Sequence, residues 1–258
     1  MKSPAFPLSI SVVLPAYNEE ECIEKAVRDA LAFLPSCYPD YRVIPVDDGS
    51  RDGTGAILKR LAAEDPHVTP VWHPENRGYG RAIASGFAAA RTDLVFFTDA
   101  DNQFDIRELK AVTEHLLETG ADAVFGFRVY RYDSVLRCIL SWVYNRLVRV
   151  LFRVKVRDVD CSFKLLKREV VERLEIECDD FFVDTEIVAR TAHLGFHTVE
   201  KGVRHYPRTA GRTTVQPSHI PRTLWTVARM WFRIHFGPRR GEAGSAAAAR
   251  AAEGPENP

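Results

Sequence analysis

Long apolar runs are missing from this sequence of 258 residues. No stretch approaches the roughly 18 consecutive apolar residues that a membrane-spanning helix needs. Arginine interrupts the longest apolar runs, as in residues 147–152 (LVRVLF). The first nine residues contain no apolar core of the kind that a signal peptide has. The sequence therefore predicts neither a multispanning membrane protein nor a secretory signal peptide.

Cysteine is scarce and irregularly spaced. The five cysteines form an odd set in which no pair has the spacing of a zinc site or a redox motif. We expect reduced thiols in the cytosol. The hydrophobic fraction of 46% and the charged fraction of 27% are ordinary for a globular protein. This composition excludes collagen, wholesale disorder and a small disulfide-stapled scaffold.

Acidic residues are almost absent from two long segments, although the formal net charge of the chain is zero. Residues 127–157 contain eight basic side chains and one acidic one, and residues 201–241 contain nine basic side chains and no acidic one. The acids gather mainly in the first 126 residues. This separation indicates one surface for a metal ion or a donor and another for an anion.

Short β-rich runs alternate with helical patterns, which predicts an α/β fold with a mixed, mostly parallel sheet flanked by helices. Residues 1–236 are predicted to form one domain, and the Gly-, Ala- and Pro-rich residues 237–258 a disordered tail. We expect strands at 10–14, 42–46, 68–72, 94–98, 121–125, 159–166 and 197–204, and helices at 19–34, 52–63, 81–90, 106–118, 135–152, 185–193 and 223–236.

Polar motifs follow the first two predicted strands, where ligands bind in parallel sheets. Residues 15–20 (PAYNEE) leave the first strand, and Asn18 is predicted to cap the next helix. The adjacent carboxylates of Asp47 and Asp48 end the second strand and need a cation or hydrogen-bond donors. An EF-hand is excluded, because its twelfth position is Lys59. Asp52 is predicted to cap the second helix.

A glycine-rich loop, residues 76–81 (NRGYGR), precedes the next predicted helix. It resembles a dinucleotide fingerprint only in part, because Ile83 stands at the third glycine position. We interpret Gly78 and Arg81 as part of a flexible loop that approaches an anion at a helix N-terminus.

Two aspartates follow the apolar run 94–98 in the sequence TDADNQ. In extended backbone the carboxylates of Asp99 and Asp101 point the same way. With the amide oxygen of Gln103 they make a hard-oxygen site. Such a site suits Mg²⁺ or Mn²⁺ bridging a diphosphate.

The order of these motifs resembles family 2 glycosyltransferases with the GT-A (Rossmann-like) fold, over residues 8–215. The resemblance implies a nucleotide-sugar donor, with a metal at Asp99, Asp101 and Gln103. It places these residues at the donor: Pro15, Tyr17, Glu19, Asp47, Asp48, Gly78, Arg81, Asp99, Ala100, Asp101 and Gln103.

Three later segments resemble polyprenyl-phosphate sugar transferases of the dolichol-phosphate mannosyltransferase type. They are Arg128 after the fifth strand, residues 158–164 (DVDCSFK), with Ser162 in place of the usual glycine, and residues 208–213 (RTAGRT). The resemblance implies that Arg128 and Arg208, with Arg212 as second candidate, bind phosphates. It implies catalytic roles for Asp101, Arg128 and Arg208, and inversion at the sugar carbon.

The acceptor stays open at this point. A polyprenyl phosphate is already anionic, whereas a saccharide or other hydroxyl acceptor needs a base, for which Asp160 and Glu186 are candidates. A non-catalytic nucleotide-sugar-binding or scaffold protein is a third hypothesis. The donor could be GDP-mannose or UDP-glucose.

Two basic, aromatic segments, 135–153 and 221–236, are predicted to form interfacial helices that lie on a membrane. The expected location is the cytoplasmic face of the membrane, through peripheral attachment or a membrane-anchored partner. Nucleic-acid binding is not expected, because no known nucleic-acid motif accompanies the arginines.

Overall fold

The computed structural model describes residues 4–130, 135–207 and 220–236. The chain divides into two compact units, residues 1–215 and 216–258. This division rests on contacts within the chain and does not test whether residues 1–236 act as one domain. The predicted single domain therefore stays a prediction. In the second unit the described element is the helix α8, Ile220–Phe236.

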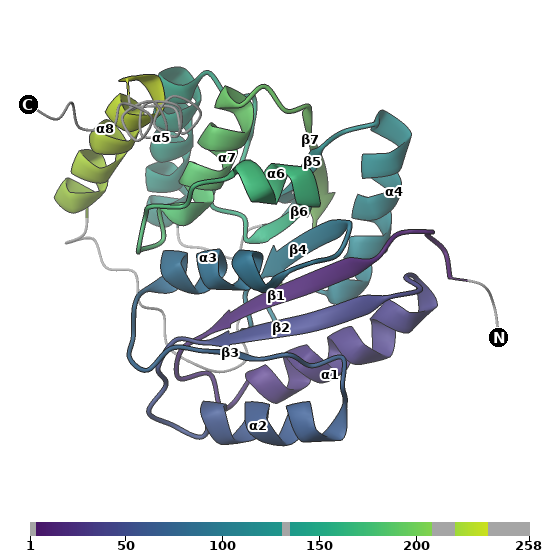
Figure 1. Cartoon of the computed structure of the whole chain (residues 1–258). Helices are drawn as coiled ribbons and strands as arrows, with labels where there is room; N and C mark the ends of the chain where they lie inside the picture. The colour runs from purple at the N-terminus through teal and green to yellow at the C-terminus, as the bar shows by residue number, and fades with distance from the viewer. Residues whose placement is uncertain (1–3, 131–134, 208–219, 237–258) are drawn as a thin grey trace, which may run out of the picture. The chain divides into compact units, whose positions relative to one another are not determined.

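A seven-stranded sheet forms the centre of the first unit, in the order β3-β2-β1-β4-β6-β5-β7 (Figure 1). β6 is antiparallel to both of its neighbours, and the other pairs are parallel. The predicted mixed, mostly parallel sheet is therefore confirmed. The strands are β1 Ile10–Ala16, β2 Tyr41–Asp47, β3 Val71–Trp72, β4 Leu94–Thr98, β5 Ala123–Arg128, β6 Phe163–Lys167 and β7 Thr198–Val203.

Helices cover both faces of this sheet (Figure 1). They are α1 Ile23–Phe33, α2 Thr54–Glu64, α3 Tyr79–Ala89, α4 Leu109–Thr119, α5 Val135–Phe152, α6 Arg168–Arg173 and α7 Val183–His193, with short 3₁₀ turns η1 Leu34–Ser36 and η2 Ile106–Glu108. Each longer helix buries an apolar stripe, as α1 does with Ile23, Val27 and Ala30.

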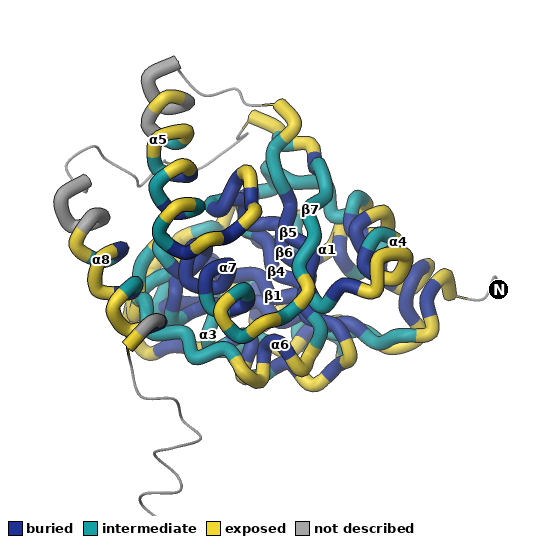
Figure 2. The backbone as a smooth tube through the Cα atoms, turned by 90° about the horizontal axis from the view of Figure 1, so that it is seen from above, coloured by how far each residue is buried: buried dark blue, intermediate teal, exposed yellow. Residues whose placement is uncertain are grey.

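The central strands are buried on both faces, as parallel strands under helices must be. Figure 2 shows β1, β4, β5 and β6 dark in the interior. Val12 and Leu14 of β1 join the cluster under α1, α2 and α4. Val13 points the other way, toward α3, where a side chain at Gly86 would meet it within 2.3 Å. Glycine at this position lets α3 lie close to the sheet.

Two predicted strands differ clearly from the observed ones, and one observed helix was not predicted. The third strand is shortened to Val71–Trp72, because Pro70 has no N–H for the ladder. β6 begins at Phe163, four residues later than expected, because the carbonyls of Val159 and Cys161 accept hydrogen bonds from Lys164 instead. The six-residue helix α6 was not predicted, because it is too short for a periodic apolar signal.

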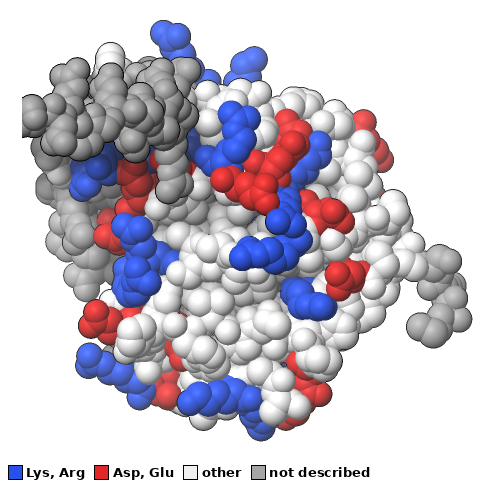
Figure 3. Space-filling view, viewed as in Figure 1, with Lys and Arg blue, Asp and Glu red and all other residues white. Residues whose placement is uncertain are grey.

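Many acids of the N-terminal half are paired locally. On α1 and α2, Glu24 and Glu64 both contact Arg28 and Arg60. Figure 3 shows acidic and basic side chains beside one another on the described face. Pairs this exposed contribute little to stability. These acids therefore have basic partners inside the N-terminal half itself.

Candidate active site

The ends of β1, β2 and β4 meet at one edge of the sheet. Ala16 at the end of β1 pairs with Asp47 at the end of β2, and Val13 pairs with Phe97 of β4. The three motifs that follow these strands are therefore neighbours. This is the edge where open α/β sheets bind ligands.

The aspartate pair after β4 lies at this edge. Asp101 is buried, with 4% of its surface exposed, and Asp99 is half-buried. Burial, and then the charge of Asp101, raise the pKa of Asp99 to about 7. Asn102, the residue after Asp101, has φ +59°. The turn at this residue lets the Gln103 N–H donate to Asp101 Oδ1 at 3.0 Å. Because the charge of Asp101 acts on Asp99, binding of a cation at this pair would be favourable.

The chemistry of these side chains fits a divalent ion. Within residues 4–130, 135–207 and 220–236, no group of three His, Cys, Asp or Glu forms an all-protein metal site. Mg²⁺ commonly takes one or two carboxylates and completes its shell with water and substrate phosphates. Asp99 and Asp101 match that pattern. Gln103 uses its side-chain N–H to hold the Tyr206 carbonyl at 3.0 Å, so only its amide oxygen could serve as a ligand.

A pocket of about 250 Å³ opens beside the end of β2. Asp47 lies in its wall, and the Ser50 N–H donates to Asp47 Oδ1 at 2.9 Å. The other residues in its wall are Gly49, Ser50, Arg51, His73, Pro74, Glu75 and Asn76.

Asp48 is bound by the protein itself. Its two carboxylate oxygens accept from the N–H groups of Arg77 at 2.9 Å and Gly78 at 2.8 Å, and from His73 Nδ1 at 2.6 Å. The other ring nitrogen of His73 lies 2.9 Å from the Ser85 hydroxyl. The Asp48 side chain is only 3% exposed. Asp48 therefore shapes the loop of residues 76–81, and its predicted contact with a nucleotide stays a prediction.

The loop after β1 is joined to the loop after β2. The N–H of Glu19 donates to Thr54 Oγ1 at 2.9 Å, and Asn18 Oδ1 accepts from the Arg51 N–H at 2.8 Å. Asn18 has φ +54° and does not cap α1, so that prediction was wrong. Pro15 is buried in β1, and Tyr17 is 43% exposed at the edge. Tyr17 is thus free of the core and available to a ligand.

The capping of α2 also differs from expectation. Gly53, not Asp52, occupies the N-cap position. Asp52 still accepts from the N–H of Thr54 at 3.0 Å and from the N–H of Glu20 at 3.2 Å. Burial raises the pKa of Asp52, but the hydrogen bonds from Thr54 and Glu20 outweigh this and lower it. The carboxylate therefore satisfies N–H groups from both loops.

Gly78 and Arg81 hold α3 against the segment before α7. Gly78 has φ +99°, and a side chain there would approach the Asp179 carbonyl oxygen to 2.2 Å. The N–H of Gly80 donates to the same oxygen at 3.0 Å, and Arg81 pairs with the Asp179 carboxylate. The predicted approach of Arg81 to an anion stays a prediction, since this contact already occupies its Nε.

We expect Gly78→Ala to lower the free energy of unfolding by at least about 2 kcal/mol, since it adds backbone strain and a clash with Asp179. Urea unfolding followed by circular dichroism measures the change. Gly120→Ala is the matched control. Gly120 also has positive φ, +64°, but nothing lies within 4 Å of an added side chain, so only about 1 kcal/mol should be lost. Equal losses in the two variants would contradict the predicted clash.

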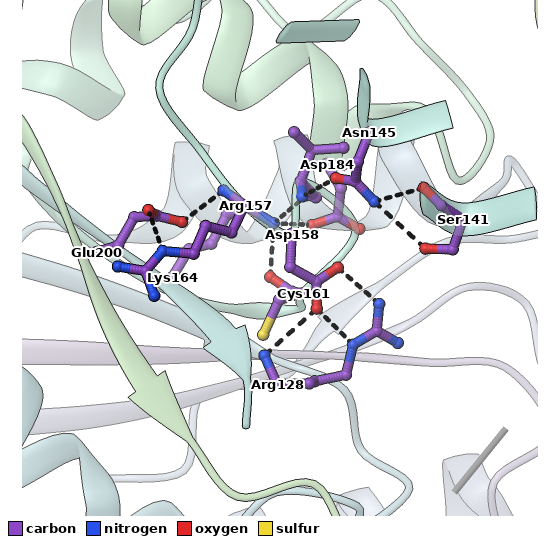
Figure 4. A network of polar contacts seen from close by, with 10 residues as sticks. Arg128, Ser141, Asn145, Arg157, Asp158, Cys161, Lys164, Asp184 and Glu200 are labelled. Carbon is purple, nitrogen blue, oxygen red and sulfur yellow. Dashed lines mark hydrogen bonds and ion pairs between the residues drawn. The ribbon is translucent and has the colours of Figure 1, made fainter. Parts of the chain in front are cut away.

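Arg128 is engaged by a neighbouring carboxylate (Figure 4). Its Nε and Nη2 donate to the two oxygens of Asp158 at 2.6 and 2.7 Å. The pair is largely buried, with 13% and 9% of the side chains exposed. Burial lowers the pKa of Arg128, but the Asp158 carboxylate more than offsets this and raises it above its ordinary value. Any phosphate that binds Arg128 would therefore share it with Asp158.

A buried lysine stabilises the turn that carries Asp158 (Figure 4). Lys164 is fully buried, and its ammonium group donates to the carbonyls of Val159 at 3.1 Å and Cys161 at 2.6 Å. It also forms an ion pair with Asp184 at the start of α7. All three donors of the ammonium group are thus satisfied. Asp184 is therefore a buried partner of Lys164 rather than a simple helix cap.

Comparison with known proteins identifies the family. The model of the family described as glycosyl transferase family 2 matches residues 11–175. The chain belongs to glycosyl transferase family 2. This match covers the three strand-end motifs and the turn with Asp158 and Lys164.

Several curated relatives are similar to this family 2 glycosyltransferase. Glycosyltransferase AglD of Haloferax volcanii is 36% identical over 90% of this chain and 38% of its own length. An undecaprenyl-phosphate 4-deoxy-4-formamido-L-arabinose transferase of Shewanella sediminis is 34% identical over 79% and 61%. A polyprenol monophosphomannose synthase of Mycolicibacterium smegmatis is 28% identical over 89% of both. The chain spans only part of the length of the first two relatives.

Solved structures share the fold. Glucosyl-3-phosphoglycerate synthase of Mycobacterium tuberculosis, in complex with Mn²⁺, UDP and phosphoglyceric acid, matches with a TM-score of 0.67 and 22% identity, over 91% of this chain and 81% of its own. Mannosyltransferase PcManGT of Pyrobaculum calidifontis, in complex with GDP-Man and Mn²⁺, matches with a TM-score of 0.58 and 21% identity, over 98% and 78%. The expected GT-A fold is confirmed.

The two candidate bases of the glycosyltransferase differ in their surroundings. Glu186 is 1% exposed and accepts from the N–H groups of Glu177 and Cys178 and from Arg190 Nε. Its carboxylate therefore holds the segment before α7. Both of its oxygens already accept hydrogen bonds, so it is not available to take a proton from an acceptor hydroxyl. Asp160 is half-buried, and its pKa is raised to about 7, chiefly because of burial. Asp160 is the better placed of the two.

Arg208 and Arg212 lie outside the described residues. Sequence reasoning missed the structural partners His73, Asp158 and Lys164. His73 lies outside every quoted motif, whereas Asp158 and Lys164 belong to the quoted segment 158–164 (DVDCSFK), whose local pattern does not indicate which distant side chains they contact. The hydroxyl of Tyr79, inside the quoted NRGYGR loop, lies 2.5 Å from Asp99 and was also left without a role.

Proposed function

We propose that this chain is a metal-dependent, inverting glycosyltransferase that moves a hexose from GDP-mannose or UDP-glucose to a polyprenyl phosphate. The observation that carries the proposal is the Asp99 and Asp101 pair beside the Asp47 pocket at one edge of the sheet. Two relatives named for polyprenyl-phosphate or polyprenol substrates support the acceptor. The inverting outcome rests on the family resemblance.

The residues of the edge divide the work of donor binding. In the proposal, Asp47 and Tyr17 hold the base and ribose, while Asp99, Asp101 and the oxygen of Gln103 hold a Mg²⁺ or Mn²⁺ ion. Such an ion supplies Lewis-acid stabilisation of the leaving diphosphate. Neighbouring structures crystallised with Mn²⁺ support a divalent ion in general.

Basic side chains receive the phosphates. Arg128 is held rigid by Asp158, so that it presents a fixed charge with little loss of side-chain entropy. Arg208, with Arg212 as second candidate, is proposed to bind the donor and acceptor phosphates. A phosphate acceptor is mostly ionised at neutral pH. The protein then has only to position it and exclude water, without a strong base.

Transfer of radiolabel tests this proposal. Purified protein is given Mg²⁺ or Mn²⁺, a short polyprenyl phosphate, and labelled GDP-mannose or UDP-glucose in parallel. We expect label that extracts into butanol only when metal is present. Nucleotide binding without any transfer, to lipid or to soluble acceptors, would instead support the non-catalytic scaffold.

A hydroxyl acceptor is the second candidate, favoured by the raised pKa of Asp160. Burial, Asp158 and Asp184 raise this pKa, while Arg128 and Lys164 lower it, with about 7 as the result. A general base must be ionised. With a hydroxyl acceptor the rate should therefore rise as pH increases through about 7 and should collapse in Asp160→Asn.

With a polyprenyl phosphate acceptor, Asp160→Asn should keep most of the rate at pH 8. Initial rates between pH 5.5 and 9, measured for both proteins with both acceptor types, separate the two candidates. A collapse of lipid-phosphate transfer in Asp160→Asn would contradict the mechanism without a base.

We propose that α5 attaches the enzyme to the cytoplasmic face of a membrane, directly or beside a membrane-anchored partner. Ile139, Trp142, Val143 and Val150 are each more than half exposed, at spacings that place them on one helical face. Asn145 and Val148, on the other side, are buried. Within the described residues, no helix is long and apolar enough to cross a bilayer.

We expect Trp142→Ser to weaken binding to vesicles of phosphatidylglycerol about tenfold, because it removes a large ring that suits the lipid interface. Cosedimentation with vesicles measures the change. Leu117→Ser, an exposed apolar residue on α4, is the control and should bind like the unaltered protein. Equal weakening in both would show that general surface hydrophobicity, not α5, causes binding.

A further inference from the structure

The hydroxyl of Tyr79 reaches the aspartate pair from another element. Tyr79 is the first residue of α3, and its hydroxyl donates to Oδ1 of Asp99 at 2.5 Å. A bond from a neutral donor to a carboxylate is among the stronger hydrogen bonds in proteins. It fixes the rotation of the Asp99 carboxylate and leaves Oδ2 for another partner.

The position of this hydroxyl is itself well defined. The ring of Tyr79 stacks on Phe181 with centroids 5.5 Å apart and 30° between the planes. The next residue, Gly80, donates its N–H to the Asp179 carbonyl at 3.0 Å. Phe181 and Asp179 both belong to the segment before α7. This segment, far from Asp99 in sequence, therefore holds the phenol in place through two contacts.

A second hydroxyl, that of Ser162, lies near Asp99 and Tyr79. Ser162 is 7% exposed, and its hydroxyl opposes the rise that burial causes in the pKa of Tyr79 and of Asp99. Ser162 precedes β6, whose Phe163 pairs with Thr98 just before Asp99. The Tyr79 hydroxyl on α3 therefore makes the direct hydrogen bond to Asp99, with the Ser162 hydroxyl nearby in the turn before β6.

We propose that Tyr79 is a positioning residue that orients the Asp99 carboxylate for a divalent cation. The inference rests on the proposed function, because the cation is the one which that function requires. Partners that orient a metal ligand by hydrogen bonds change metal affinity about 10- to 100-fold when they are removed. Tyr79 would act through Asp99 and need not touch the substrate.

Binding of Mn²⁺ to the donor-free protein tests the inference without any reaction. The free-ion electron paramagnetic resonance signal is titrated with protein, alone and with UDP or GDP added. Tyr79→Phe removes the hydroxyl and keeps the ring on Phe181. We expect Mn²⁺ to bind about tenfold more weakly in this variant.

Tyr38→Phe is the matched control. The Tyr38 hydroxyl is buried 2.6 Å from Thr113 Oγ1, between η1 and α4, so the same atom is lost from a buried hydrogen bond away from the aspartates. We expect this variant to lose thermal stability without any change in Mn²⁺ affinity. A role of Tyr79 in folding alone would give the same result for both variants.

A second variant guards against misfolding. Phe181 is 48% exposed, so Phe181→Leu should fold while loosening the stack, and we expect Mn²⁺ to bind about threefold more weakly. If Tyr79→Phe folds and binds Mn²⁺ as the unaltered protein does, the inference is overturned. If Tyr79→Phe does not fold, unchanged Mn²⁺ binding in Phe181→Leu overturns it. In either case the proposed function still stands. If the unaltered protein binds no Mn²⁺ with or without nucleotide, the proposed function fails first, and the inference with it.

Discussion

Asp101→Asn is expected to reduce glycosyl transfer by at least about 1,000-fold, equivalent to roughly 4 kcal/mol of transition-state stabilisation. The change removes one charge from the pair with Asp99 but keeps an oxygen that can accept from the Gln103 N–H. The fold should therefore persist while the affinity for Mg²⁺ or Mn²⁺ falls. Initial rates of transfer, measured beside the unfolding midpoint, separate the two effects.

The control is Asp105→Asn, at a carboxylate four residues later in the chain. Asp105 caps η2 by accepting from the Arg107 N–H at 3.0 Å and pairs with the exposed Arg107 side chain. Asparagine keeps the capping oxygen, so the rate should stay within about twofold of the unaltered enzyme. Full activity in Asp101→Asn would refute the metal site at this pair.

Lys164→Met is expected to lower the free energy of unfolding by about 3–5 kcal/mol. The ammonium group of Lys164 is completely buried and satisfies Asp184 and two carbonyls of the turn at residues 159–161. Its loss would leave a buried carboxylate without a countercharge. Denaturant unfolding at neutral pH measures the change.

Lys167→Met is the matched control on the same strand. Lys167 pairs with Asp122 at 2.9 Å with about a third of its side chain in solvent, so its loss should cost no more than about 1 kcal/mol. Adding Asp184→Leu to Lys164→Met should restore part of the stability, because the stranded carboxylate is removed. A loss in Lys164→Met as small as in Lys167→Met would contradict the role of the buried ion pair.

The aspartate motif shows how far the sequence reaches into the site. The apolar run of β4 followed by Asp99 and Asp101 predicts two carboxylates at a strand end, and they lie there. Parallel neighbours end at the same edge, so Asp47 could be placed beside them in advance. Local patterns suffice here because strand direction and burial follow from the periodicity of the residues themselves.

Asp48 and Arg128 show where that reasoning ends. Both belong to quoted motifs, yet Asp48 holds the loop of residues 77–78 and Arg128 is bound to Asp158. The partner of Arg128 lies thirty residues away along the chain, and Lys164 reaches across twenty to Asp184. No local pattern encodes which polar groups meet after the sheet is assembled.

By itself the sequence determined the alternation of strands and helices, the strand-end placement of the motifs and the acidic pair of Asp99 and Asp101. Periodicity and turn chemistry act over a few residues, and these features depend on nothing more distant. Only the tertiary structure decided that Glu186 is occupied by hydrogen bonds, that Lys164 is buried, and that Tyr79 reaches Asp99. Those outcomes follow from burial, which requires each polar group to find a partner wherever packing brings one.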